Sequence, residues 1–284
     1  MRLALFFLFL MTSISGWSDG KPKLTDYKKN VFSQWGEDGI IEKIFETIGT
    51  TSKTAIEFGA HDGFLFSNTA NLWTKDLGWN CILIESDASI FGTLVSNVSR
   101  YSCTPLLRTV GIHPHNSLET ILKEVNLKMP VDILSIDVDG DDYYLLQSIQ
   151  YLKPRLIICE YNPSIPAHLD VYSDYGNHIG CSVAALQRIA AEKGYSLVAI
   201  TDTNCFFVLN EEFPKFAKFE TDREHIRINR WITYVISDYR GQYKLIGADN
   251  FAEPWGWAQN PSPEVCHGNI TQLPGSVQKP RTRQ

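Results

Sequence analysis

The sequence predicts an α/β fold: a mostly parallel sheet of seven strands with helices on both faces. Short apolar segments alternate with helical segments from about residue 33 to residue 209. Such alternation is typical of parallel strands joined by helical crossovers. The last two apolar segments are separated only by residues 202–204, which are too few for a crossover helix. The sheet should therefore end in an antiparallel hairpin strand.

Each predicted strand is a short apolar run, and each predicted helix repeats apolar residues at spacings of three and four. Gly49 and Gly194 follow two of the helical runs and end them. The strands are expected at residues 54–58, 80–85, 104–110, 131–137, 155–160, 195–201 and 205–209. The helices are expected at residues 38–45, 68–75, 90–98, 117–125, 142–151 and 183–193.

The 284 residues include 44% hydrophobic and 20% charged residues, an ordinary globular composition for one large domain or two small ones. Residues 1–16 are expected to be a signal peptide, because Met1 and Arg2 precede an apolar run too short to span a bilayer. We divide the rest into an N-terminal helical segment at 17–50, a Rossmann-like domain at 51–212 and a C-terminal extension with a flexible basic tail at 213–284.

A cleaved signal would place the mature chain in the secretory pathway, secreted or periplasmic, with no stable membrane span. An uncleaved segment would leave the chain cytoplasmic. The net charge of −6, from 26 basic and 32 acidic residues, argues against a nucleic-acid partner. The six cysteines form no C-x-x-C pair, so zinc ribbons and thioredoxin chemistry have no support, and one or two disulfides stay open.

The first candidate site is the turn after the first strand, from Glu57 to Gly63. Gly59 and Gly63 allow a tight turn and a close approach of the backbone to a ligand. Their spacing differs from the glycine motifs of dinucleotide and phosphate-loop proteins, which disfavours NAD and ATP. Glu57 could receive a ligand ammonium group, or the turn could be purely structural.

Glu85 ends the second strand, where an acid is suited to bind ribose hydroxyls. His61, in the glycine turn, could face a substrate, although a solvent-exposed turn histidine is the alternative. Asp87 is expected to be the N-cap of the next helix.

Two further loops at strand ends are rich in oxygen ligands. Asp137 and Asp139 follow the fourth strand, and Glu160 and Asn162 follow the fifth. Neighbouring strands would bring these side chains together, and such oxygen ligands suit Mg²⁺, Ca²⁺ or Mn²⁺. The metal could lower the pKa of a substrate hydroxyl, or one carboxylate could act as a general base without metal.

Residues 33–41, 56–63, 134–143 and 158–163 together resemble the FkbM-type, S-adenosylmethionine-dependent methyltransferases, within about residues 33–209. The resemblance implies the class I methyltransferase form of the Rossmann-like fold and O-methylation of a sugar or small natural product. It implies that Glu57, Gly59 and Gly63 hold S-adenosylmethionine, with Glu85 on the ribose, and we place Asp137 beside them. The acids after strands four and five are similar to the metal ligands of catechol-type O-methyltransferases, which suggests Asp137, Glu160 and Asn162 as ligands.

We assign catalysis to Asp137, Asp139 and His61. Recognition of the small-molecule or glycan acceptor is expected in the long segment 164–180 and around Trp255 and Trp257. Two other classes stay open, because a secreted enzyme would need imported cofactor. One is a secreted binding module that keeps the fold without catalysis, and the other is a metal-dependent hydrolase.

Overall fold

The computed structural model describes residues 20–76, 78–127, 130–237, 239 and 243–247. The strands are β1 (Thr54–Phe58), β2 (Asn80–Glu85), β3 (Cys103–Leu107), β4 (Ile133–Ile136), β5 (Leu156–Glu160), β6 (Tyr195–Ile200), β7 (Asn204–Leu209), β8 (Thr233–Ser237) and β9 (Tyr243–Gly247). The α-helices are α1 (Glu37–Ile48), α2 (Ala70–Lys75), α3 (Ala88–Val98), α4 (Leu118–Glu124), α5 (Asp142–Ser148), α6 (Val183–Glu192) and α7 (Arg223–Ile226). The 3-10 helices are η1 (Leu24–Tyr27) and η2 (Phe213–Phe216).

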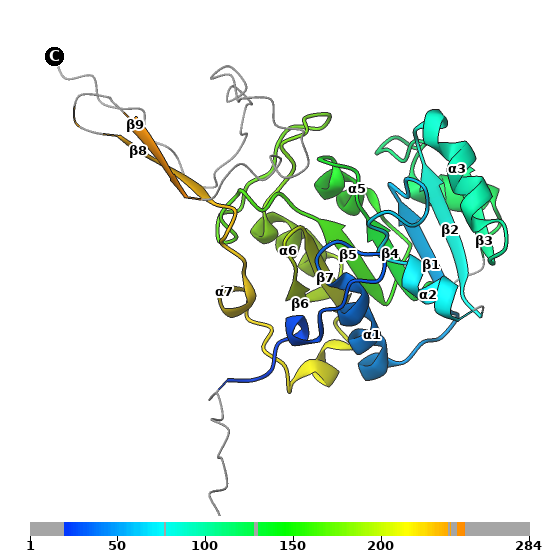
Figure 1. Cartoon of the computed structure of the whole chain (residues 1–284), viewed down its shortest axis with the longest axis horizontal. Coiled ribbons are helices and arrows are strands. Elements are labelled where there is room, and N and C mark those ends of the chain that lie inside the picture. Colours follow the sequence, from blue (N-terminus) through cyan, green and yellow to red (C-terminus); the bar gives the residue numbers. More distant parts are fainter. Residues whose placement is uncertain (1–19, 77, 128–129, 238, 240–242, 248–284) are drawn as a thin grey trace, which may run out of the picture.

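Seven strands form one sheet in the order β3-β2-β1-β4-β5-β7-β6 (Figure 1). Strands β1 to β5 are parallel, and β7 runs antiparallel to both β5 and β6. Phe58 pairs with Ile84 on one side and Ile136 on the other, so β1, β2 and β4 end at one edge. The predicted fold is confirmed, and the strand order with one reversed strand is that of the class I methyltransferase form of the Rossmann-like fold.

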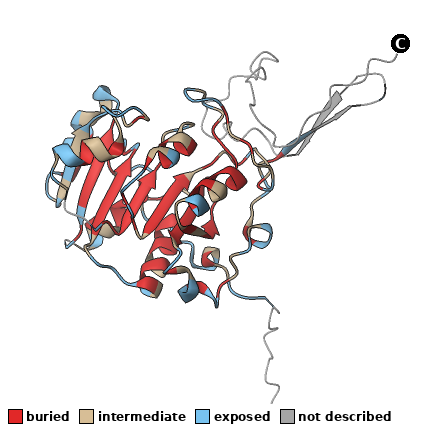
Figure 2. Ribbon diagram, turned by 180° about the vertical axis from the view of Figure 1, so that it is seen from behind, coloured by how far each residue is buried: buried red, intermediate tan, exposed pale blue. Residues whose placement is uncertain are grey.

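Helices cover both faces of this sheet. Helices α4, α5 and α6 pack on one face, and α1, α2 and α3 pack on the other. Successive strand residues enter opposite cores, as Ile82 and Leu83 of β2 do. Figure 2 shows the strands buried between helices whose outer sides are exposed. Burial on both faces explains why these strands are continuous apolar runs in the sequence.

Two predicted elements end three residues earlier than expected. Strand β3 ends at Leu107 instead of residue 110, and α5 ends at Ser148 instead of residue 151. After α5 the backbone turns out of the helix at Ile149, and the carboxylate of Glu119 on α4 accepts the amide protons of Gln150 and Leu152, both at 3.0 Å. A side chain from another helix therefore binds the amides that a longer α5 would use internally.

A buried aspartate fixes the loop before α1 at the carboxyl edge of the sheet. One carboxylate oxygen of Asp38 accepts the amide protons of Val31, Phe32 and Ser33 at 2.7, 2.8 and 2.9 Å. The Ser33 hydroxyl in turn accepts the amide proton of Asp38 at 3.1 Å. The helix itself begins after Gly36, whose φ of 97° is left-handed. These hydrogen bonds therefore hold the backbone of loop 31–36 in one conformation.

The segment after α7 returns to the same edge. The Arg230 guanidinium lies 5.1 Å from the ring of Trp35 and 5.0 Å from the ring of Trp231, a cation–π arrangement. Asp202, in the turn between β6 and β7, accepts hydrogen bonds from both Arg230 and Trp231. The N-terminal loop, the sheet and the C-terminal segment are thereby joined before the β8–β9 hairpin extends outward (Figure 1).

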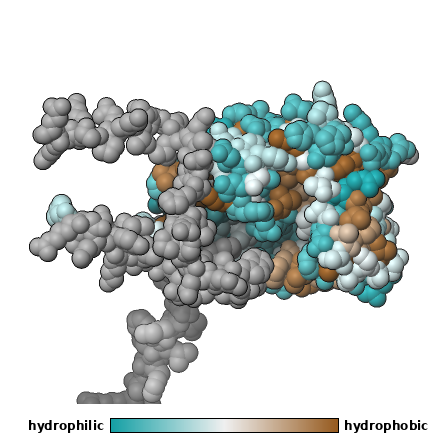
Figure 3. Space-filling view, turned by 90° about the horizontal axis from the view of Figure 1, so that it is seen from above, coloured by the Kyte–Doolittle hydropathy of each residue, from teal (hydrophilic) through white to brown (hydrophobic). Residues whose placement is uncertain are grey.

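Among the residues that the structure describes, no helix combines the length and apolar character needed to cross a bilayer. On the face seen in Figure 3, hydrophobic side chains lie interspersed among hydrophilic ones. The predicted signal peptide at 1–16, Trp255, Trp257 and the basic tail lie outside the described residues.

Candidate functional site

A cavity of about 580 Å³ opens at the carboxyl edge of the sheet. It lies where the strand order reverses between β1 and β4, the usual ligand position in open α/β sheets. Its volume falls within the range of small-molecule sites. The walls come from the ends of β1 to β5 and the loops that follow them, from α3 and α5, and from three other segments. They include Gln34, Glu57, Gly59, His61, Glu85, Arg108, Asp137, Asp139, Asp141, Glu160, Tyr175 and Thr203.

The two glycines of the first turn have different roles. Gly59 lines the cavity with a φ of 79°, and a β-carbon there would lie 1.7 Å from the carbonyl oxygen of Asp137. Gly63 also has a left-handed φ, of 88°, but a β-carbon there would meet Leu94 and Val98 of α3. Gly63 is not among the residues that line the cavity and packs against α3, and its predicted contact with the cofactor stays a prediction.

Glu57 lines the cavity, but its carboxylate has partners within the chain. It accepts hydrogen bonds from the hydroxyls of Ser67 at 2.6 Å and Thr69 at 2.5 Å, and from the Asn68 amide at 2.8 Å. Burial raises the pKa of Glu57, while these hydrogen bonds act in the opposite direction. In the structure the Glu57 carboxylate holds segment 67–69 in place. Its contact with a ligand ammonium group stays a prediction.

Glu85 is held in a fixed orientation at the end of β2. One of its carboxylate oxygens accepts the His61 amide proton and the other the Asp87 amide proton, each at 2.7 Å. Each oxygen keeps a lone pair for a hydroxyl group. Asp87 accepts from the Ser89 amide and is the N-cap of α3, as predicted. The His61 ring is half-exposed and lies 3.8 Å from the Asp62 carboxylate, and its catalytic role stays a prediction.

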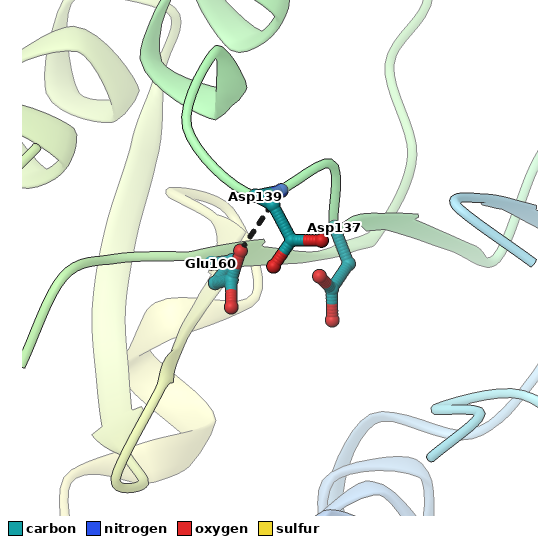
Figure 4. Close-up of side chains that lie close together, drawn as sticks. All are labelled: Asp137, Asp139 and Glu160. Atoms are coloured by element: carbon teal, nitrogen blue, oxygen red, sulfur yellow. Dashed lines mark hydrogen bonds between the residues drawn. The ribbon is translucent and has the colours of Figure 1, made fainter. Parts of the chain in front are cut away.

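Three carboxylates from the ends of β4 and β5 converge beside the cavity (Figure 4). One oxygen each from Asp137, Asp139 and Glu160 lies within 4.8 Å of the others. The Asp139 amide, at a left-handed φ of 55°, donates to Glu160 at 3.2 Å. Burial, together with Asp142 and Asp139, raises the pKa of Asp137, and burial with Asp137 raises that of Glu160. Such a cluster favours a shared proton or a bound cation.

Asn162 lines a second cavity together with Asp139 and Glu160, and its predicted role as a metal ligand stays a prediction. Its amide nitrogen donates to the Ile179 carbonyl at 2.7 Å. Its oxygen accepts from the amide and the hydroxyl of Ser164, at 2.9 and 2.6 Å. Both lone pairs of the amide oxygen are therefore engaged in a local turn, and the acidic side chains that converge are those of Asp137, Asp139 and Glu160.

Asp142 fixes the loop that carries Asp137 and Asp139. Its two carboxylate oxygens accept the amide protons of Val138 and Gly140, each at 3.0 Å. The side chain is almost fully buried, and burial raises the pKa of Asp142 to about 7.

We expect the free energy of unfolding to fall as the pH rises from about 4 to 7. The folded state then holds protons on Asp142 and its neighbours that the unfolded state has released, so each such group lowers stability by up to about 1.4 kcal/mol per pH unit. Urea unfolding of wild type and Asp142→Asn at pH 5, 6, 7 and 8 measures this slope. The variant should be less stable but show a shallower slope, and equal slopes would contradict the assignment.

The long segment 164–180 is attached to the loop after β4. The Asp141 carboxylate accepts the Gly176 amide proton at 2.7 Å, and the Tyr144 hydroxyl donates to the Ser173 carbonyl at 3.0 Å. Tyr175, from this segment, lines the cavity. The predicted position of acceptor recognition therefore borders the site, although recognition itself stays a prediction.

Several cavity residues were not among the predicted site residues, and three of them come from different parts of the chain. Gln34 comes from the loop before α1, Arg108 follows β3, and Thr203 lies in the turn between β6 and β7. Arg108 could have been found from its place directly after a parallel strand. Gln34 and Thr203 reach the cavity only through tertiary packing.

No known family model matches this sequence, and no curated protein matches it significantly. Among solved structures, it is similar to the N-terminal domain of EvdMO1 with SAH bound, at 13% identity and TM-score 0.39, over 61% of this chain and 79% of that one. It is also similar to an S-adenosylmethionine-dependent methyltransferase from Clostridium acetobutylicum, at 8% identity and TM-score 0.39, over 61% and 90%. A third is a putative caffeoyl-CoA O-methyltransferase from Staphylococcus aureus, at 15% identity and TM-score 0.39, over 60% and 81%.

Proposed function

We propose that the protein is an S-adenosylmethionine-dependent methyltransferase that methylates a hydroxyl group of a sugar or small natural product. One observation carries the proposal: a single cavity joins the Gly59 turn of β1, Glu85 of β2 and the carboxylates after β4 and β5. The first two suit a nucleoside cofactor, and the third suits activation of a hydroxyl.

On the cofactor side, the Gly59 turn provides backbone without a side chain, so a ligand can approach closely. Glu85 is oriented by two backbone amides and can accept hydrogen bonds from a ribose diol. The cavity volume of about 580 Å³ is within the range of small-molecule sites.

On the acceptor side, Asp137, Asp139 and Glu160 orient the hydroxyl and take its proton as it attacks the methyl carbon. The raised pKa of Asp137 and Glu160 brings these carboxyl groups nearer to the range in which a general base is effective. The rigid loop held by Asp142 keeps the oxygen in line with the methyl group, which supplies much of the rate.

The carboxylate cluster also fits a divalent cation. Three oxygens from different residues converge, and hard cations such as Mg²⁺ or Mn²⁺ prefer carboxylate ligands. We propose Asp137, Asp139 and Glu160 as its ligands, where a bound cation would lower the pKa of the acceptor hydroxyl. We keep the secretory pathway as the proposed location, with cofactor supplied by import.

Calorimetric titration of the chain with S-adenosylmethionine, with and without Mg²⁺, tests the proposal. We expect micromolar binding by wild type and at least about tenfold weaker binding by Glu85→Ala, because a charged hydrogen bond contributes about 1.5 to 3 kcal/mol. Asp26→Ala, at an exposed residue of η1, is the control. Absence of binding by folded wild type would contradict the function, and unchanged affinity in Glu85→Ala would contradict only the ribose assignment.

A further inference from the structure

Two thiols lie opposite each other at the far side of the sheet from the candidate site. Cys81 of β2 and Cys103 of β3 are register partners on adjacent parallel strands. Both side chains belong to the hydrophobic core on the α1–α3 face, so they point to the same side of the sheet. The Cys81 thiol also lies 3.7 Å from the Thr69 hydroxyl.

This arrangement is within the reach of a disulfide. Adjacent strands lie about 4.8 Å apart, and the α-carbons of a disulfide are usually about 4.4 to 6.8 Å apart. The strands already hold the two backbones in place, so only the sulfur atoms need to move. In the structure both cysteines are thiols.

One thiol of the pair, that of Cys103, is accessible, whereas Cys81 is only 2% exposed. Cys103 is half-buried, and a cavity of about 490 Å³ at the amino ends of β2 and β3 is lined by both cysteines. Cys159 of β5 and Cys205 of β7 form a second pair of register partners, but neither of these thiols is partly exposed. Both of those residues are fully buried, and the Cys159 thiol donates to the Asp142 carbonyl at 3.9 Å.

We propose that Cys81 and Cys103 form a disulfide when the folded chain meets an oxidising thiol buffer. The Cys103 thiolate attacks oxidised glutathione and releases one reduced glutathione, giving a mixed disulfide. The Cys81 thiolate then attacks the Cys103 sulfur and releases the second glutathione. Two thiols lose two protons and two electrons, and one glutathione disulfide becomes two thiols.

The bridge would join the edge strand of the sheet to its neighbour. Strand β3 pairs only with β2 among the described strands, and none of its residues is fully buried. A disulfide between Cys81 and Cys103 closes a short loop that contains α3 and lowers the conformational entropy of the unfolded chain. The oxidised protein should therefore melt about 5 to 10 °C above the reduced protein.

Full-length protein, equilibrated folded in glutathione buffers of increasing oxidised fraction, tests the proposal. Free thiols are alkylated, and peptides are mapped by mass spectrometry without reduction. We expect one linked peptide pair, Cys81 with Cys103, while Cys159 and Cys205 stay alkylated as internal controls. Cys103→Ser should lose both the linked pair and the rise in melting temperature.

Two results would overturn the proposal. One is full alkylation of Cys81 and Cys103 in the most oxidising buffer. The other is a Cys103 link to a different cysteine, such as Cys266. The mapping uses wild type, so the outcome does not depend on how well the variant folds, and it does not depend on methyltransferase activity.

Discussion

Replacing Gly59 with alanine should destabilise the fold strongly. The added β-carbon would lie 1.7 Å from the carbonyl oxygen of Asp137, and the φ of 79° is itself unfavourable for alanine by about 1 to 2 kcal/mol. The clash is between the β-carbon, whose position the backbone fixes, and a backbone carbonyl at the end of β4, so no side-chain rotation relieves it. We expect a loss of more than about 4 kcal/mol from a typical stability of 5 to 15 kcal/mol.

Urea unfolding followed by circular dichroism measures this loss. Gly194→Ala is the matched control, because Gly194 has a similar φ of 88° and nothing within 4 Å of the added β-carbon. The control should cost only about 1 to 2 kcal/mol for its backbone conformation. If the two variants lose the same stability, contact between the ends of β1 and β4 is not what requires Gly59.

Asp137→Asn should lower the rate of methyl transfer by about 10² to 10⁴, the usual contribution of a general base. The amide cannot take the acceptor proton, and it removes one carboxylate from the cluster with Asp139 and Glu160. Cofactor affinity should change by less than about threefold, since Glu85 and the Gly59 turn are untouched. Single-turnover kinetics and calorimetry on the same preparation separate the two effects.

Asp141→Asn is the control for this change. Asp141 belongs to the same loop and lines the same cavity, but its carboxylate binds the Gly176 amide, which an asparagine oxygen can still do. We expect its rate to stay within about threefold of wild type. Equal loss in both variants would indicate that loop geometry, and not the Asp137 carboxylate, limits the reaction.

The fold could be predicted from sequence because local and tertiary signals agree. Strands buried on both faces are continuous apolar runs, as in β4 and β5, and the three-residue turn before β7 excludes a crossover. The errors occur where a distant side chain decides the boundary. The end of α5 depends on Glu119 of α4, and no local pattern reveals that contact.

The candidate site was predicted in part for a related reason. Asp137, Asp139 and Glu160 end neighbouring parallel strands, so their convergence follows from topology alone. The Asn162 oxygen accepts hydrogen bonds from the amide and hydroxyl of Ser164, a local turn that topology does not reveal, and its role as a ligand stays a prediction. The packing of Gly63 against α3 is a contact between separate elements, so the glycine spacing alone does not reveal it.

The acidic walls of the cavity have a consequence for turnover. Among the side chains that line it, carboxylates such as Glu85, Asp139 and Asp141 outnumber the single arginine, Arg108. In the proposed reaction the cofactor arrives as a positively charged sulfonium and departs as a neutral thioether. The walls attract the first more than the second, which favours exchange of spent for fresh cofactor. Added salt screens this attraction, so inhibition by the demethylated product should increase with ionic strength.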